Sequence, residues 1–154
     1  MKKSTKFIIA LLVTVGALAI TYRVVNQAPS KDLAADAQMQ EIITSGGCLQ
    51  CHSGSPDLPF YANWPVASGM VQKDVTQGYR AFDMTEMAEA LKAGKPVGKV
   101  ALAKVEKVIM DGTMPKHAYY MVHWGSSVTD AKKEMAMAWV KQHRLAHYCL
   151  LYTS

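Results

Sequence analysis

Cys48-Leu49-Gln50-Cys51-His52 is the stretch of sequence that decides how this chain folds. Two thiols at this spacing reach the two vinyl groups of one porphyrin and form thioethers, and the histidine that follows supplies the proximal nitrogen of the iron. The motif therefore predicts one haem c, attached covalently through Cys48 and Cys51, with His52 as the proximal ligand.

Two other chemistries use paired cysteines. A structural zinc site needs two further Cys or His ligands at paired spacing, and the remaining cysteine, Cys149, lies at the end of the chain. A redox-active dithiol of the thioredoxin type needs a strand–helix–strand context, whereas this motif follows a predicted helix and enters a proline-rich stretch. Haem attachment is favoured over both of these and over a chance match.

The sixth ligand of the iron has to come from elsewhere in the chain. Met114 lies in Gly112-Thr113-Met114-Pro115, a loop that directly follows a predicted helix and is stiffened by the proline. Ligation by histidine and methionine gives a six-coordinate iron with a raised potential, which suits the transfer of single electrons. We predict Met114 as this distal ligand. His123 is the alternative and would give an iron of lower potential.

Other polar and aromatic side chains have simpler expected roles. His143 and His147 are expected to be solvated on a charged helix surface. Six aromatic residues are expected to pack against the porphyrin and to exclude water from it: Phe60, Tyr61, Trp64, Tyr119, Tyr120 and Trp124.

Basic residues are concentrated at the N-terminus. Four of the 17 lysines and arginines lie in the first 23 residues, which contain no acidic residue, and the other 13 are set against 12 acidic residues. The formal charge of +5 therefore belongs to a membrane-targeting segment. A nucleic-acid partner has no support.

This N-terminal segment is predicted to be an uncleaved anchor in the inner membrane. Lys2, Lys3 and Lys6 precede an uncharged run that extends from Phe7 to Tyr22. The lysines are expected to stay in the cytoplasm, which sends the rest of the chain into the periplasm. Cleavage near Ala19, which would release the domain into the periplasm, is the alternative.

The remaining chain predicts an all-α fold, a small c-type cytochrome-like helical domain behind the anchor helix. Apolar residues recur at helical spacing in four segments, and no segment alternates well enough to predict a strand. The predicted helices cover residues 32–44, 85–93 and 100–110 and a segment that begins near Thr129. Residues 53–69, which contain three prolines, are predicted to form a loop.

The chain is predicted to divide into four segments. They are a signal or anchor segment at 1–23, a linker at 24–31, a mono-haem c-type cytochrome domain at 32–148 and a tail at 149–154. The tail is predicted not to be protein-derived, because its back-translation TGT-CTC-TTA-TAC-ACA-TCT matches a transposon-end adapter used in sequencing libraries. On this hypothesis the sequence is natural only up to about Tyr148, and a following domain has been cut off.

Several of these motifs together resemble the small mono-haem haem-binding domain family, and most closely the N-terminal domain of membrane-anchored tri-haem bacterial cytochrome c peroxidases. The stretches that carry the resemblance are 48–53, 57–61, 78–83, 94–97, 113–115 and 123–124. The resemblance implies that His52 and Met114 ligate a low-spin haem. It also implies a quinol donor and a separate domain that holds the peroxidatic haems.

Two classes of function follow. The first is an electron-transfer domain, the electron-input part of a cytochrome c peroxidase; this chain has no second Cys-x-x-Cys-His and therefore no catalytic site of its own. The second is a haem-based gas or ligand sensor with a weak or open sixth site. Because the sequence offers two candidate distal ligands, Met114 and His123, electron transfer is favoured.

Overall fold

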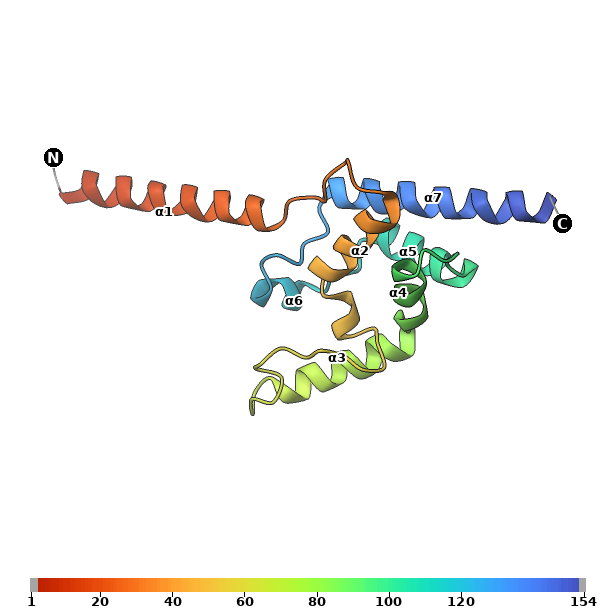
Figure 1. Cartoon of the computed structure of the whole chain (residues 1–154). Coiled ribbons are helices and arrows are strands. Elements are labelled where there is room, and N and C mark those ends of the chain that lie inside the picture. Colours follow the sequence, from red (N-terminus) through yellow and green to blue (C-terminus); the bar gives the residue numbers. More distant parts are fainter. Residues whose placement is uncertain (1–2, 153–154) are drawn as a thin grey trace.

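The computed structural model describes residues 3–152, with side chains from Ser4 to His147, and this part of the chain is all-α, as predicted (Figure 1). The elements are α1 (Lys3–Val25), α2 (Ala35–Ser45), the 3-10 turn η1 (Cys48–Gln50), α3 (Ser68–Ala81), α4 (Thr85–Lys92), α5 (Lys99–Asp111), α6 (His117–Val122) and α7 (Asp130–Tyr152). The side chains of the predicted tail at 149–154 lie outside the described residues.

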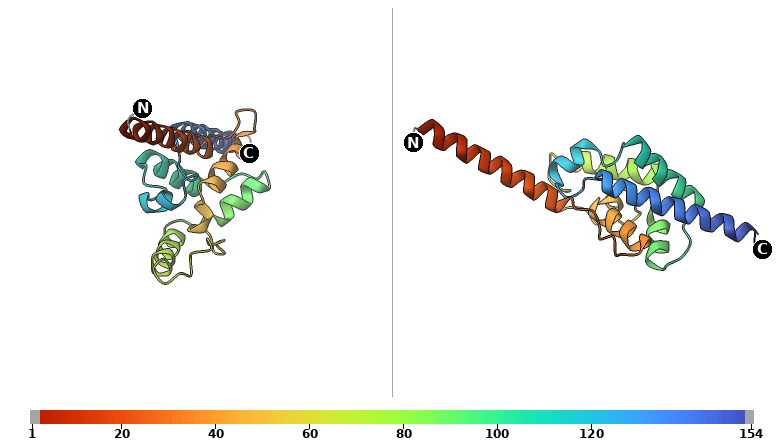
Figure 2. Two further views of the ribbon diagram at one scale, coloured as in Figure 1. Left: turned by 90° about the vertical axis from the view of Figure 1, so that its left-hand side faces the viewer. Right: turned by 90° about the horizontal axis from the view of Figure 1, so that it is seen from above.

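Helix α1 projects away from the other helices as a single rod (Figures 1 and 2). Its segment Ser4–Val25 has a mean hydropathy of 2.2, and its side chains are exposed. A helix of 23 residues is about 33 Å long, which is enough to cross the hydrocarbon core of a bilayer. The helix therefore has the length and composition of a membrane anchor or a signal segment.

The hydrophobic core lies where α7 crosses α2 and α5, with α4 closing it from the other side of α2. Apolar side chains at helical spacing along each helix meet there, because each helix has one apolar face to bury. The most deeply buried members are Val97, Leu102, Ala136, Trp139 and Val140. This core supports the end of α2, which leads directly into the Cys-x-x-Cys-His motif.

The four helices predicted from the spacing of apolar residues are present. Two of them end at glycines with φ near +61°, Gly94 after α4 and Gly112 after α5, a conformation that lets the chain leave a helix without strain. The first begins at Ala35 instead of Asp32. Residues before it form a turn, in which the backbone N–H of Leu33 donates to the carbonyl of Ser30 over 3.3 Å.

Two helices were not predicted. Helix α3 buries only a glycine, Gly78, so its sequence lacks the apolar stripe by which helices are recognised. Helix α6 has six residues, too few for a periodic pattern. The predicted loop at 53–69 therefore ends at Ala67, and α3 follows it.

The C-terminal end of α1 is bonded to the loop between α6 and α7. The Asn26 side chain is 3% exposed; its Nδ2 donates to the Trp124 carbonyl over 2.6 Å and its Oδ1 accepts from the Ser127 N–H over 2.9 Å. The Tyr22 hydroxyl lies 2.8 Å from the hydroxyl of Ser127. These contacts fix the direction in which α1 leaves the helical domain.

Candidate haem site

The Cys-x-x-Cys-His motif forms the turn η1 at the end of α2. Gly47 opens the turn with a φ of 64°, and a Cβ at this position would overlap the Tyr119 hydroxyl, so a glycine is required for both reasons. The N–H groups of Cys51 and His52 both donate to the Cys48 carbonyl, over 3.3 and 3.0 Å. This compact turn holds two free, half-buried thiols and the His52 ring together on one short segment.

His52 is bound at both its ring and its backbone to the segment between α3 and α4. Its Nδ1 lies 2.8 Å from the Phe82 carbonyl oxygen, and its own carbonyl accepts from the Met84 N–H over 2.7 Å. Because a carbonyl only accepts, Nδ1 carries the proton and Nε2 carries the lone pair. This arrangement, a backbone acceptor that fixes the tautomer, is how metal-binding histidines are usually oriented.

The two thiols have different surroundings. Burial raises the pKa of Cys48 to about 11, and the pKa of Cys51 is also raised, first by burial and then by the charge of Asp74. Helix α3 packs closely on Cys51, since a Cβ at Gly78 would lie 2.5 Å from the Cys51 carbonyl oxygen. Both thiols are therefore protonated at neutral pH.

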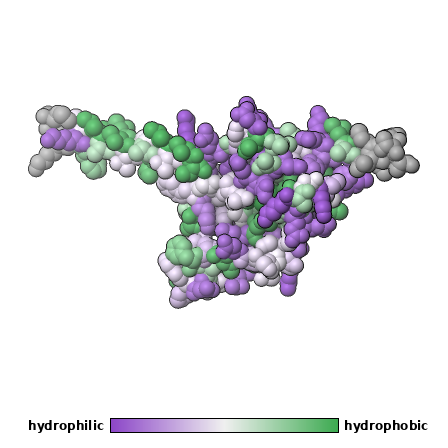
Figure 3. All heavy atoms as spheres, in the orientation of Figure 1, coloured by the Kyte–Doolittle hydropathy of each residue, from purple (hydrophilic) through white to green (hydrophobic). Residues whose placement is uncertain are grey.

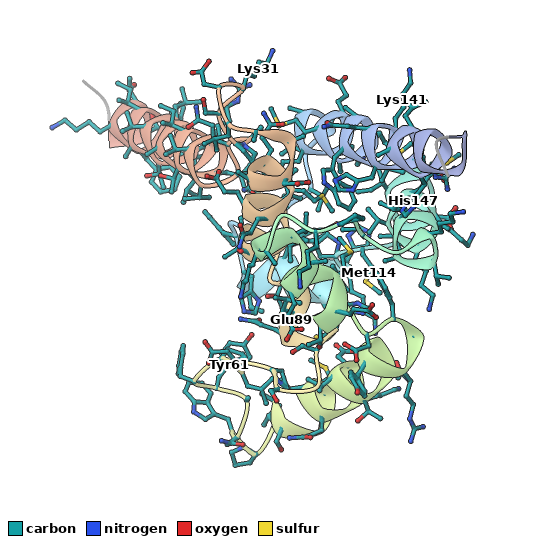
Figure 4. The ribbon with its side chains drawn as sticks, turned by 45° about the vertical axis from the view of Figure 1, so that its right-hand side comes forward. Lys31, Tyr61, Glu89, Met114, Lys141 and His147 are labelled. Atoms are coloured by element: carbon teal, nitrogen blue, oxygen red, sulfur yellow. The ribbon has the colours of Figure 1, made fainter. Side chains whose placement is uncertain are left out.

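Met114 lies on the connection between α5 and α6 and is 37% exposed. It follows the helix end at Gly112, as predicted, and it is labelled in Figure 4. Among the described residues, no hydrogen bond involves its thioether sulfur.

His123, the alternative distal ligand, has partners at both ring nitrogens. Nδ1 lies 3.0 Å from the Tyr119 carbonyl, so it carries the proton, and Nε2 lies 3.0 Å from the Tyr61 hydroxyl, from which it accepts. The ring is also stacked on that of Tyr119, with the centroids 4.0 Å apart. As an iron ligand, His123 would have to give up its bond to Tyr61.

Sequence reasoning missed the groups that hold the motif in place. The Phe82 acceptor is a backbone atom, which no residue type reveals. The Tyr119 hydroxyl donates to Gln50 Oε1 over 2.7 Å and so joins α6 to the motif. Lys132 is 1% exposed, and its Nζ donates to the Ser45 hydroxyl, three residues before Cys48, over 3.4 Å.

The prediction for His143 and His147 was wrong. Nε2 of His143 lies 2.7 Å from Asp36 Oδ1, which also accepts from Trp139 Nε1 over 2.7 Å. Nε2 of His147 lies 2.8 Å from the Val97 carbonyl. These two histidines lie between α7 and its neighbours, because α7 packs against both α2 and α5.

The donor set of the motif suits a haem better than a zinc ion. Among the side chains that the structure describes, from Ser4 to His147, no group of three or more His, Cys, Asp or Glu residues is arranged to hold a metal ion by itself. Two thiols and an imidazole with a free Nε2 are the groups that attach a haem and ligate its iron from one side.

Comparisons with known proteins agree with this chemistry. The family model of the haem-binding domain matches residues 7–142. Cytochrome c peroxidase Ccp of Escherichia coli (strain K12) is 35% identical over 102 residues, which is 66% of this chain and 22% of that protein. This chain thus spans about a fifth of the curated relative that it matches. No solved structure matches it. Since the family model covers most of its length, the chain belongs to the haem-binding domain family.

Proposed function

We propose that this chain is a c-type cytochrome domain that is anchored in the inner membrane, faces the periplasm and passes single electrons. Cys48 and Cys51 hold one haem c through thioethers, and His52 and Met114 are the axial ligands. When bound, the haem supplies a one-electron couple. The residues of the chain fix its position and select the ligands of the iron.

The bond between His52 and the Phe82 carbonyl carries this proposal. It turns the lone pair of Nε2 away from the α3–α4 segment, and it raises the basicity of the ring as a ligand. His123, by contrast, has hydrogen-bond partners at both ring nitrogens. Among the described residues, His52 Nε2 has no protein partner.

Met114 is favoured over His123 for the same reason. Nε2 of His123 already accepts from Tyr61, whereas the Met114 thioether is accessible in a loop between two helices. Ligation by histidine and methionine raises the potential relative to two histidines. The domain is therefore suited to relay electrons at a relatively high potential.

The relation to cytochrome c peroxidase suggests where the electrons go. We propose that this domain is the electron-input part of such a peroxidase, that a quinol in the membrane is its donor and that the peroxidatic haems lie in a following domain. The similarity to the Escherichia coli protein and the apolar helix α1 support this role.

The distal ligand is tested by near-infrared and Soret spectra of the haem-loaded chain and of two variants. The parent and His123→Ala should show the charge-transfer band of a methionine-ligated ferric haem, and Met114→Ala should lose it. A band that survives in Met114→Ala would contradict the assignment. Rapid binding of carbon monoxide by the reduced parent would favour the sensor function instead.

A further inference from the structure

Apolar side chains gather on two neighbouring surface segments of the helical domain. One is the loop before α3, where Phe60 is 83% and Val66 94% exposed. The other is the end of α6, where Met121 is 73% exposed. We call the surface formed by these segments the apolar face, and its members are Phe60, Trp64, Val66, Met121, Val122 and Trp124. Three of them, Phe60, Trp64 and Trp124, were expected from the sequence to pack against the porphyrin, and here they are assigned to lipid instead.

The apolar face lies on the side of the domain from which α1 projects. In Figure 1 the loop before α3 and helix α6 both reach the level at which α1 ends, and the view from above in Figure 2 shows the same arrangement. Tyr61, on that loop, lies on the same side in Figure 4. Figure 3 shows apolar surface on this end of the lower part of the domain.

The direction of α1 is fixed relative to this face. Asn26 bonds to Trp124 and Ser127 over 2.6 and 2.9 Å, and Trp124 is itself a member of the apolar face. A helix that crosses a bilayer and is held in this way brings the face to the level of the lipid headgroups. Tyr22, at the end of α1, is exposed at the same level, and Trp and Tyr are the residues enriched at that depth.

Two pairs of polar side chains lie on or beside α3 and α6, the helices that adjoin the apolar face. Lys116 Nζ and Asp74 Oδ1 form an ion pair at 2.7 Å, and the Tyr120 hydroxyl lies 2.5 Å from His117 Nδ1. Pairing lowers the cost of moving such groups from water into an interface. The surroundings of the face are therefore compatible with contact to lipid.

We propose that the apolar face rests in the headgroup region of the bilayer that α1 crosses, so that the domain contacts lipid at a second place besides its anchor. This inference rests on the proposed membrane anchoring. Exposed aromatic and aliphatic side chains on one side of a domain can insert into the boundary between headgroups and acyl chains. The contact holds the loop before α3, and with it the haem site, close to the membrane surface.

The experiment uses the haem-loaded full chain in phospholipid vesicles, with the photoreactive residue p-benzoylphenylalanine placed at Phe60, Val66 or Met121. Leu145, an exposed apolar residue on α7, is the matched control position. After illumination, mass spectrometry should detect phospholipid adducts at the three positions in several-fold higher yield than at Leu145. Equal yields at all four positions would overturn the proposal, as would adducts with haem or with another protein.

A second measurement needs no substitution. Phospholipids with a photoreactive acyl chain should label the parent protein within residues 59–70 and 117–124, and labelling confined to α1 would overturn the proposal. An alkaline carbonate wash distinguishes a failure of the membrane anchor from a failure of the lipid contact at the apolar face. Protein released by the wash contradicts the anchoring itself, whereas retained protein without labelling of the domain contradicts only the apolar face.

Discussion

The two cysteines of the haem motif differ in how easily their thiols ionise. Burial raises the pKa of the Cys48 thiol to about 11. The pKa of the Cys51 thiol is also raised, first by burial and then by the charge of Asp74. The thiolate is the reactive form, and a thiol with a pKa of 11 has about one part in a thousand as thiolate at pH 8.

We therefore expect iodoacetamide to alkylate Cys48 more slowly than Cys51 in the haem-free chain. The rates are measured at pH 8 by mass spectrometry on Cys51→Ser and Cys48→Ser, each combined with Cys149→Ser so that one thiol remains. Equal rates, or a faster reaction at Cys48, would show that its burial is not maintained in solution. Denaturation in urea is the control and should make the two rates alike.

A second prediction at this scale concerns Lys132, whose pKa is lowered by burial from 10.5. The unfolded chain keeps this proton up to about its ordinary pKa, while the folded chain releases it at lower pH. The free energy of unfolding therefore rises with pH between the folded pKa and 10.5, and this gain is lost as the pH falls through the folded pKa.

Lys132→Met should lack this rise. The free energy of unfolding of the parent and of the variant is measured by urea unfolding in mild detergent, at pH 8 and near pH 10.5. The difference between the parent and the variant at each pH gives the contribution of Lys132. Lys141→Met, an exposed lysine on the same helix, controls for the loss of one charge. If the free energies of unfolding of the parent and of Lys132→Met change with pH in parallel, the buried ammonium of Lys132 is not the cause of the rise.

Among the secondary-structure elements, α3 packs directly on the haem motif at Gly78. Its Gly78 backbone lies so close to Cys51 that an added Cβ would come within 2.5 Å of a backbone oxygen. Gly78→Ala should displace α3 and the Phe82 carbonyl that follows it, at a cost of about 1–3 kcal/mol in the free energy of unfolding.

Gly69→Ala is the matched control, because a Cβ there meets nothing within 4 Å and alanine favours a helix by up to about 1 kcal/mol. Urea unfolding of the haem-loaded chain, followed by the Soret band, should show Gly78→Ala less stable than the parent and Gly69→Ala equal or more stable. The idea that α3 is held through Gly78 is abandoned if both variants behave alike.

The packing of each helix explains whether it could be predicted from the sequence. The helices α2, α4, α5 and α7 bury apolar faces, so their spacing predicted them. Helix α3 packs through a glycine and α6 is short, so neither left a periodic signal. Cys48, Cys51 and His52 could be proposed from the motif, but the Phe82 carbonyl and the Tyr61–His123 bond depend on the tertiary fold.

For the whole molecule, with α1 as the proposed membrane anchor, the bonds of Asn26 predict that the domain has one orientation relative to the bilayer. The Soret band of the haem-loaded parent in oriented lipid multilayers should therefore be linearly dichroic. Asn26→Ala removes the bonds to Trp124 and Ser127 and should reduce the dichroism. Asn63→Ala, an exposed asparagine in the loop before α3, should keep the value of the parent, and a parent without dichroism would contradict the fixed orientation.

With the proposed electron-transfer function, the Asn26 bonds also affect how the domain would meet its electron partners. A flexible linker of eight residues would let a tethered domain explore a radius of ~15 Å and collide with partners in many poses. A domain held in one orientation does not make this search and always exposes the same surface. A donor that diffuses in the membrane then meets the same surface at every encounter, and a partner bound elsewhere in the same assembly has either a permanent electron path to this domain or none.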